Sequence, residues 1–125
     1  MRIRPLAYDF AVCKVQDYSG VNLESPFCFI GKTDEERSLV CLAQDVPANV
    51  THCEDGWRAF GIEGELDFSL IGILARICGI LAEKEIGVFA VSTFNTDYIL
   101  VKAEHFDSAL SALAEAGYQI THQES

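Results

Sequence analysis

The chain has 125 residues, which is enough for one compact domain or two very small ones that share a core. Hydrophobic residues make up 50% and charged residues 22%, as in a soluble globular protein, and the formal net charge is -10 at pH 7. Phosphate groups are bound by clustered Lys and Arg, so this charge argues against nucleic-acid binding and against binding to anionic membranes.

The location of the protein is predicted from what the sequence lacks. The longest apolar stretch, residues 70–81, is interrupted by Gly72, Arg76 and Gly79, so no transmembrane segment is expected. The N-terminal segment has no small-residue cleavage site, so no signal peptide is expected either. The cysteine count is odd, there is no C-x-x-C pair, and four of the five cysteines lie in apolar runs, namely Cys13, Cys28, Cys41 and Cys78. We therefore expect buried thiols in a reducing compartment, the cytoplasm.

The first half of the sequence predicts strands and loops. Residues 6–15 alternate between large apolar and smaller or polar side chains, as a half-buried strand does. Residues 27–33 and 37–42 are two further strand candidates, and the polar residues between them predict a hairpin. Residues 44–49 contain Pro47, which leaves room for at most a short helix.

The second half predicts four strands and two helices. An acidic segment opens the first helix, with Asp67 or Ser69 as the expected N-cap, and Gly117 ends the second helix. These elements are, in chain order, residues 57–62, 70–81, 88–93, 98–101, 104–116 and 118–120. This β-α-β-β-α-β order predicts an α+β, ferredoxin-like fold with an antiparallel sheet and two helices on one face. About 65 residues make a small core, so a partner surface is expected.

The first half resembles a shortened copy of the second. Residues 29–40 and 91–101 each contain an apolar strand, a Thr-Asp pair and a strand that ends in Leu-Val, which indicates an internal repeat. In this alignment Asp34 corresponds to Asp97. The helices of the first copy are then reduced to loops.

Two polar segments in the second half are candidates for a ligand site. A helix start carries unpaired N–H groups and a partial positive charge, so it can hold a carboxylate. Asp97 can accept a charge-assisted hydrogen bond from an amino or guanidinium group. Both segments also have structural interpretations, because acidic residues cap helices and Asn, Thr and Asp are common in tight turns. The candidate residues are Glu65, Leu66, Asp67, Phe68, Ser69 and Gly72 in the first segment, and Thr93, Phe94, Asn95, Thr96 and Asp97 in the second.

The C-terminal half resembles an ACT domain, and residues 67–75 (DFSLIGILA) are similar to the strand-to-helix motif of that family. The whole chain is similar to short stand-alone tandem ACT proteins and to the ACT pairs of the CASTOR arginine sensors. The segments that carry this resemblance are residues 33–36, 39–41, 56–60, 66–70 and 92–101. The resemblance implies a degenerate N-terminal ACT-like half at residues 1–56 and a C-terminal ACT domain at residues 57–125.

The resemblance also implies a function. ACT proteins of this kind are non-catalytic regulatory sensors that bind a free amino acid or a similar small zwitterion where two ACT units meet. The two candidate segments lie at the positions where the family places its ligand. We therefore expect an allosteric, homodimeric ligand sensor that a protein partner reads, with no cofactor. The alternative is a ligand-free module for protein–protein interaction or dimerisation.

Catalytic and metal motifs are missing from the sequence. It has no Gly-x-Ser-x-Gly, no phosphate-binding loop and no His-Glu-x-x-His. The run from His52 to Asp55 has the wrong spacing for a tetrahedral zinc site. Glu63 and Glu65 could form a carboxylate pair, but nothing in the sequence shields them from water. We therefore expect neither an enzyme nor a metal site.

Overall fold

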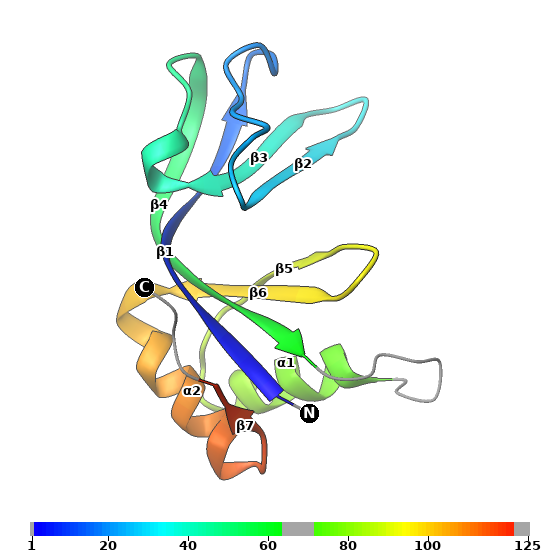
Figure 1. Cartoon of the computed structure of the whole chain (residues 1–125), viewed down its shortest axis with the longest axis vertical. Helices are drawn as coiled ribbons and strands as arrows, with labels where there is room; N and C mark the ends of the chain where they lie inside the picture. The colour runs from blue at the N-terminus through cyan, green and yellow to red at the C-terminus, as the bar shows by residue number, and fades with distance from the viewer. Residues whose placement is uncertain (1, 64–71, 122–125) are drawn as a thin grey trace. The chain divides into compact units, whose positions relative to one another are not determined.

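The computed structural model describes residues 2–63 and 72–121, and the chain divides into two compact units (Figure 1). Unit 1 comprises Met1–Ala7 and Arg58–Ser125, and unit 2 comprises Tyr8–Trp57. Two long strands, β1 (Arg2–Val15) and β4 (Val50–Glu63), contribute residues to both units. Unit 2 ends at Trp57, and residues 1–7 belong to unit 1 with the C-terminal part of the chain. The division into two ACT-like halves after residue 56 stays a prediction.

Unit 1 has the predicted β-α-β-β-α-β order, which confirms the α+β, ferredoxin-like plan. Its elements are β4, α1 (Ile73–Glu83), β5 (Phe89–Ser92), β6 (Asp97–Lys102), a 3-10 turn η2 (Ala103–His105), α2 (Phe106–Glu115) and β7 (Gln119–Ile120). The sheet has one more strand than expected, because the start of β1 pairs in parallel with β7, with Ile3 opposite Ile120. In the sheet β4 neighbours β1 on one side and β6 on the other, and β5 pairs with β6.

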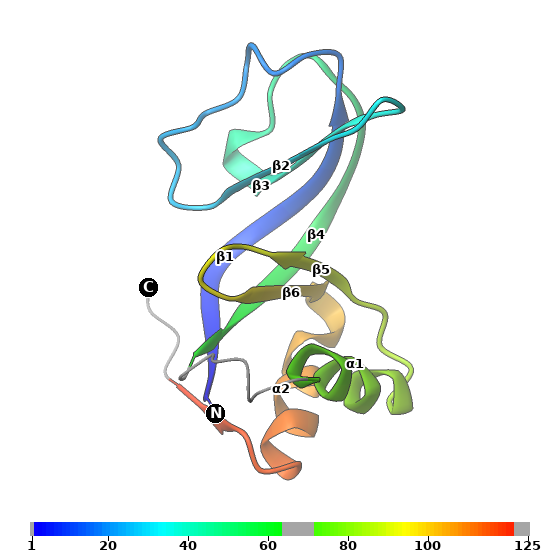
Figure 2. The same cartoon turned by 90° about the vertical axis from the view of Figure 1, so that its right-hand side faces the viewer.

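Both helices of unit 1 pack on one face of this sheet, and Figure 2 shows them on the same side of the β5–β6 hairpin. Alternate residues of a strand share a face, so Phe60 and Ile62 of β4 point toward the helices with Ile99 and Val101 of β6. The core contains these four residues together with Ile3, Ile77, Leu81, Ile86, Phe106, Ala109 and Leu113.

Unit 2 contains β2, β3, the second part of β1 and the first part of β4. β3 (Arg37–Leu42) pairs antiparallel with β1 and with β2 (Cys28–Lys32), in a hairpin that confirms the sequence prediction. Its core contains Ala11, Cys13, Val15, Leu39 and Cys41. All of residues 8–57 are described, and their only helical element is the 3-10 turn η1 (Ala43–Asp45). The loops expected in place of helices are therefore present.

None of the helices in the described part of the chain has the length and apolar character needed to cross a membrane.

Candidate functional site

The predicted polar turn closes the β5–β6 hairpin. The N–H of Thr93 donates to the carbonyl oxygen of Thr96 at 2.8 Å, and the N–H of Thr96 donates to Thr93 Oγ1 at 3.3 Å. Ser92 and Asp97 lie opposite each other at the base of the turn, where Ser92 Oγ donates to Asp97 Oδ1 at 2.5 Å. We call residues Thr93, Phe94, Asn95, Thr96 and Asp97 the 93–97 turn. The side chain of Thr93 fixes the shape of this turn, and Ser92 orients the Asp97 carboxylate.

The 93–97 turn is bonded to the end of β4. Thr96 Oγ1 donates to the carbonyl oxygen of Ile62 at 2.6 Å, in a partly buried contact. The ring of Tyr98 packs over Gly61, where a Cβ atom would lie 3.1 Å from the ring, so a larger residue at this position would push the ring away. The turn therefore lies beside the end of β4. The first candidate segment, which begins at residue 65, follows this strand in the sequence.

Helix α1 begins later than the sequence predicts. Its N-cap is Gly72, which has a φ of 87°, and no side chain caps the helix. The expected N-cap at Asp67 or Ser69 is therefore wrong, because glycine adopts this left-handed conformation without strain and precedes the first helical residue, Ile73. The first N–H groups of an α-helix have no partner within the helix, so this exposed start retains the anion-binding property that the sequence argument needs.

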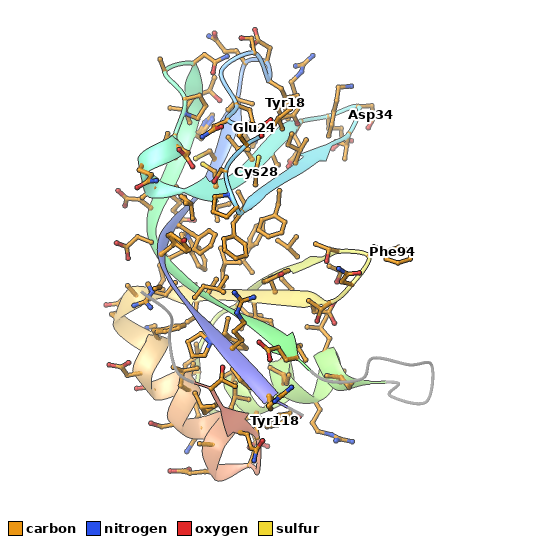
Figure 3. The ribbon with its side chains drawn as sticks, viewed as in Figure 1. Tyr18, Glu24, Cys28, Asp34, Phe94 and Tyr118 are labelled. Atoms are coloured by element: carbon orange, nitrogen blue, oxygen red, sulfur yellow. The ribbon has the colours of Figure 1, made fainter. Side chains whose placement is uncertain are left out.

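The other predicted site residues are placed as follows. Glu65, Leu66, Asp67, Phe68 and Ser69 lie outside the described residues. Gly72 is exposed, and no atom lies within 4 Å of the position that its Cβ would take, so nothing in the described structure blocks an approach to it. Phe94 is fully exposed at the tip of the 93–97 turn and points away from the protein (Figure 3), and Asn95 beside it is also exposed. Thr96 and Asp97 are half-buried.

Asp97 also lies close to helix α1. Burial raises the pKa of the Cys78 thiol on that helix, and the negative charge of Asp97 raises it further. A carboxylate at the start of β6 thus contributes to the electrostatic field at α1. The arrangement groups one carboxylate and several hydroxyl groups beside the end of β4.

The corresponding turn in unit 2 has the same backbone but other side chains. The N–H of Thr33 donates to the carbonyl oxygen of Glu36 at 3.0 Å, as that of Thr93 does to Thr96, and Lys32 pairs with Arg37 across the hairpin. The two threonines are therefore equivalent. The sequence alignment of Asp34 with Asp97 is wrong by three residues: Asp34 corresponds to Phe94, and both lie at turn tips in Figure 3.

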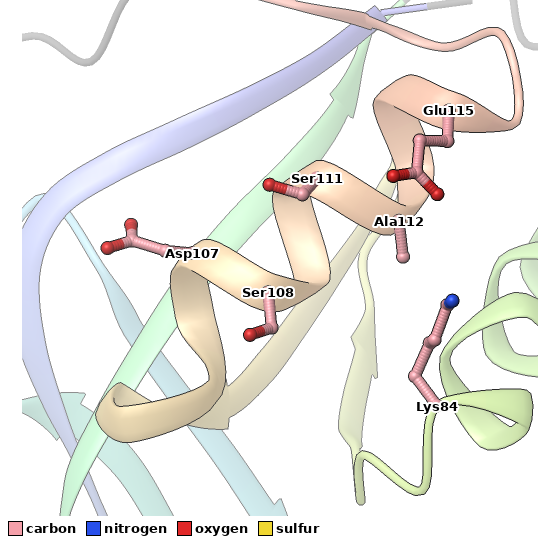
Figure 4. Close-up of a pocket in the computed structure, with 6 residues that line it drawn as sticks. All are labelled: Lys84, Asp107, Ser108, Ser111, Ala112 and Glu115. Atoms are coloured by element: carbon pink, nitrogen blue, oxygen red, sulfur yellow. The ribbon is translucent and has the colours of Figure 1, made fainter.

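A shallow depression of about 350 Å³ lies between the end of α1 and the outer face of α2 (Figure 4). It is lined by Lys84, Asp107, Ser108, Ser111, Ala112 and Glu115. All of these residues except Ala112 are exposed to solvent, and none of them is a predicted ligand-binding residue.

Glu63 has a structural environment that the sequence does not show. Its carboxylate lies 3.7 Å from Arg4 Nε and 3.9 Å from Arg2 Nη2, both on β1, while Glu65 lies outside the described residues. Within residues 2–63 and 72–121, no group of three or more His, Cys, Asp or Glu side chains could hold a metal ion.

Two site features were missed in the sequence, the side chain of Ser92 and the carbonyl group of Ile62. Ser92 could have been found from the hairpin register, because a four-residue turn places residues 92 and 97 opposite each other. The Ile62 carbonyl has no sequence signal, since its bond to Thr96 depends on how β4 lies beside β6.

Comparisons with known proteins identify the family. The family model for the ACT domain matches residues 52–115. Over 58 residues the chain is 40% identical to the cytosolic arginine sensor for mTORC1 subunit 1 of Homo sapiens, and equally to that of Bos taurus. This match covers 46% of the chain and 18% of the relative, so the chain corresponds to less than a fifth of the curated proteins it matches.

Solved structures share the fold. A crystal structure of an Agobacterium tumefaciens protein matches 99% of this chain and 96% of its own with a TM-score of 0.84 and 27% identity. Aspartate kinase from Clostridium acetobutylicum matches 87% of this chain over 33% of its own, with a TM-score of 0.67 and 13% identity. The observed α+β sheet with two helices on one face agrees with these matches and with the family model, and the chain belongs to the ACT-domain family.

Proposed function

We propose that this chain is a non-catalytic regulatory protein that binds a free amino acid or a similar small zwitterion. The ligand contacts the 93–97 turn and residues 65–72, which precede helix α1 in the sequence, where two ACT units meet. The single observation that carries this proposal is the hydrogen bond of Thr96 Oγ1 to the Ile62 carbonyl, because it fixes the polar turn beside the end of β4.

The two groups of the ligand require different partners. An ammonium group fits the carboxylate of Asp97, which is half-buried and already oriented by Ser92. Such charge-assisted bonds are shorter and stronger than neutral ones. A carboxylate fits the first N–H groups of α1, which have no partner within the helix, and Gly72 has no atom within 4 Å of its Cβ position in the described structure. One site then recognises both charges of a zwitterion.

The regulatory role is supported by the cytosolic arginine sensor for mTORC1 subunit 1, to which this chain is 40% identical over 58 residues. Since the chain spans 18% of that protein, we carry over a sensing role and not the whole protein's partners. We place the sensor in the cytoplasm, as a homodimer of chains with a degenerate N-terminal ACT-like half and a C-terminal ACT domain. The ACT units must be able to pack in two different ways, and the ligand must bind one arrangement more tightly than the other. Only then can ligand binding change what a protein partner recognises.

The first experiment is a thermal-shift screen against the twenty amino acids. A ligand that binds only the native state stabilises it by about 2.7 kcal/mol at a hundredfold excess over Kd, so the melting temperature rises. We expect a rise with one amino acid or a small chemical group of them. No rise with any of the twenty at millimolar concentration contradicts the proposal and favours a ligand-free docking module, for which the fully exposed Phe94 offers an aromatic side chain at the surface.

The second experiment assigns the site. Asp97→Asn keeps the size of the side chain and removes its charge, so we expect the Kd of the ligand to rise about tenfold or more. Asp34→Asn is the matched control, because Asp34 lies in the equivalent turn of unit 2 at the position of Phe94. If both variants bind as the parent protein does, the ligand site is elsewhere.

A further inference from the structure

Unit 2 contains four of the five cysteines of the chain, and all five are free thiols. Cys13 on β1 and Cys53 on β4 are 40 positions apart in sequence, and their sulfur atoms lie 3.6 Å apart. Cys28 and Cys41 face each other across the β2–β3 hairpin. None of these thiols belongs to the candidate ligand site, and the described residues include no cluster that could hold a metal ion.

We propose that Cys13 and Cys53 are a redox site, which closes to an intramolecular disulfide when the protein meets a peroxide and reopens when a dithiol reduces it. Their sulfur atoms must approach by about 1.6 Å to reach the usual disulfide bond length. Rotation about a Cα–Cβ bond can move a sulfur atom by more than this, and the two cysteines lie on neighbouring strands of the sheet.

The two thiols have unequal roles. Cys53 is exposed, whereas only 3% of Cys13 is accessible to solvent. Burial, followed by the neighbouring Cys53 thiol, raises the pKa of Cys13 to about 12. The thiolate is the form that attacks an oxidant, so Cys13 is both shielded and weakly reactive. Cys53 is therefore the thiol that reacts first, and Cys13 is the resolving thiol.

The reaction balances with hydrogen peroxide as the oxidant. The Cys53 thiolate attacks one peroxide oxygen, the O–O bond breaks, and the leaving hydroxide takes a proton to become water, which leaves a sulfenic acid on Cys53. The Cys13 sulfur then attacks the Cys53 sulfur, the S–O bond breaks, and the hydroxide leaves as water with the Cys13 proton. Two thiols are oxidised by two electrons, and one peroxide is reduced to two molecules of water.

Cys41 is the main competitor for this pairing. It is buried on β3, and its thiol is close enough to affect the pKa of Cys13. Cys41 is shielded from an oxidant, whereas Cys53 is open to it, so the first oxidation step favours Cys53. The bond would connect β1 and β4, the two strands that continue from unit 1 into unit 2. This proposal is independent of the ligand site in unit 1.

The experiment treats the reduced full-length chain with hydrogen peroxide and then labels the remaining thiols with iodoacetamide under denaturing conditions. Intact mass spectrometry should show five labels before oxidation and about three after it, with five restored by dithiothreitol. A digest without reductant should contain the peptide that links Cys13 to Cys53. The Cys53→Ser variant should carry the same number of labels before and after oxidation. The Cys78→Ser variant, which changes a cysteine of unit 1, should still lose two labels on oxidation.

Three results would overturn this assignment. The first is oxidation of Cys53 to sulfinic or sulfonic acid without loss of the Cys13 thiol. The second is a linked peptide that contains Cys41 in place of Cys53. The third is a cross-link between chains, which appears as a dimer on a gel without reductant. Because Cys53 is exposed, the serine variant at this position tests the chemistry without disturbing the core.

Discussion

Replacing Thr96 with Val tests the contact on which the candidate site depends. Valine has nearly the shape of threonine, so Thr96→Val removes one hydroxyl donor and leaves the backbone of the turn in place. The carbonyl oxygen of Ile62 then loses the 2.6 Å hydrogen bond from Thr96, and Ile62 is only 2% exposed to solvent. A net hydrogen bond contributes about 1 kcal/mol, and an unsatisfied buried acceptor costs about 1–3 kcal/mol, so we expect a loss of about 1–2 kcal/mol.

The assay is urea unfolding followed by circular dichroism, with hydrogen exchange on the backbone amides of residues 93–97. Thr51→Val is the matched control, because Thr51 Oγ1 donates to the Lys14 carbonyl at 3.3 Å on the exposed surface of unit 2. Water replaces that bond, so the control should change the free energy of unfolding by less than about 0.5 kcal/mol. The Thr96 variant should also exchange its turn amides faster and bind ligand more weakly.

Equal free energies of unfolding for the two threonine variants would refute this reasoning. Unchanged exchange in the 93–97 turn would do the same, because the turn would then be held by its internal Thr93–Thr96 bonds alone. A loss of stability with full ligand affinity would show that the bond to Ile62 supports the fold and does not position the site.

Three further predictions concern stability. Asp17 accepts hydrogen bonds from Ser19, which lower the pKa of its carboxyl group from 3.8. Its contribution to stability is therefore present above that pH and is lost as the pH falls through the lowered pKa, so Asp17→Asn should destabilise the protein more at pH 7 than at pH 3, measured by urea unfolding at both values. Leu81→Ala should cost about 2–5 kcal/mol of unfolding free energy because this side chain is fully buried, whereas Leu23→Ala, at a residue that is 69% exposed, should cost less than about 0.5 kcal/mol. Oxidation of Cys13 and Cys53 to a disulfide should raise the melting temperature by about 10 °C in a calorimetric scan, and dithiothreitol should reverse this rise.

Local patterns were sufficient to predict most elements of both units. The apolar alternation of the strands and the helical stripe of α1 are set by neighbours within a few residues, so their types and order follow from the sequence. The hairpin of β2 and β3 follows in the same way from two apolar runs around a polar turn.

The start of β1 could not be predicted from local patterns. Arg2, Arg4 and Pro5 look unlike a buried strand, yet Ile3 is fully buried and pairs with β7 at the other end of the chain. The two arginines are accommodated because Glu63 of β4 lies near both of them. Pairing across more than 100 residues and a charge partner from another strand leave no signal in the N-terminal segment itself.

The start of α1 was misplaced for a different reason. Apolar residues recur at helical spacing from residue 70 to Leu81, on both sides of Gly72, so periodicity alone gives no boundary there. The left-handed backbone at Gly72 sets that boundary, and only the glycine itself indicates it. Gly72 was predicted as a ligand-binding residue, and the structure shows that it is also the N-cap of α1.

The register of the two hairpins decides how many ligands one chain can bind. The turns of units 1 and 2 share their backbone bonds, so a repeat of structure alone would suggest two equivalent sites. At the base of the turn, however, unit 1 has Asp97 opposite Ser92, and unit 2 has Arg37 opposite Lys32. A ligand ammonium group is attracted by the first pair and repelled by the second. We therefore expect isothermal titration calorimetry to give one bound ligand per chain. Two equal sites per chain would show that the carboxylate of Asp97 does not select the ligand.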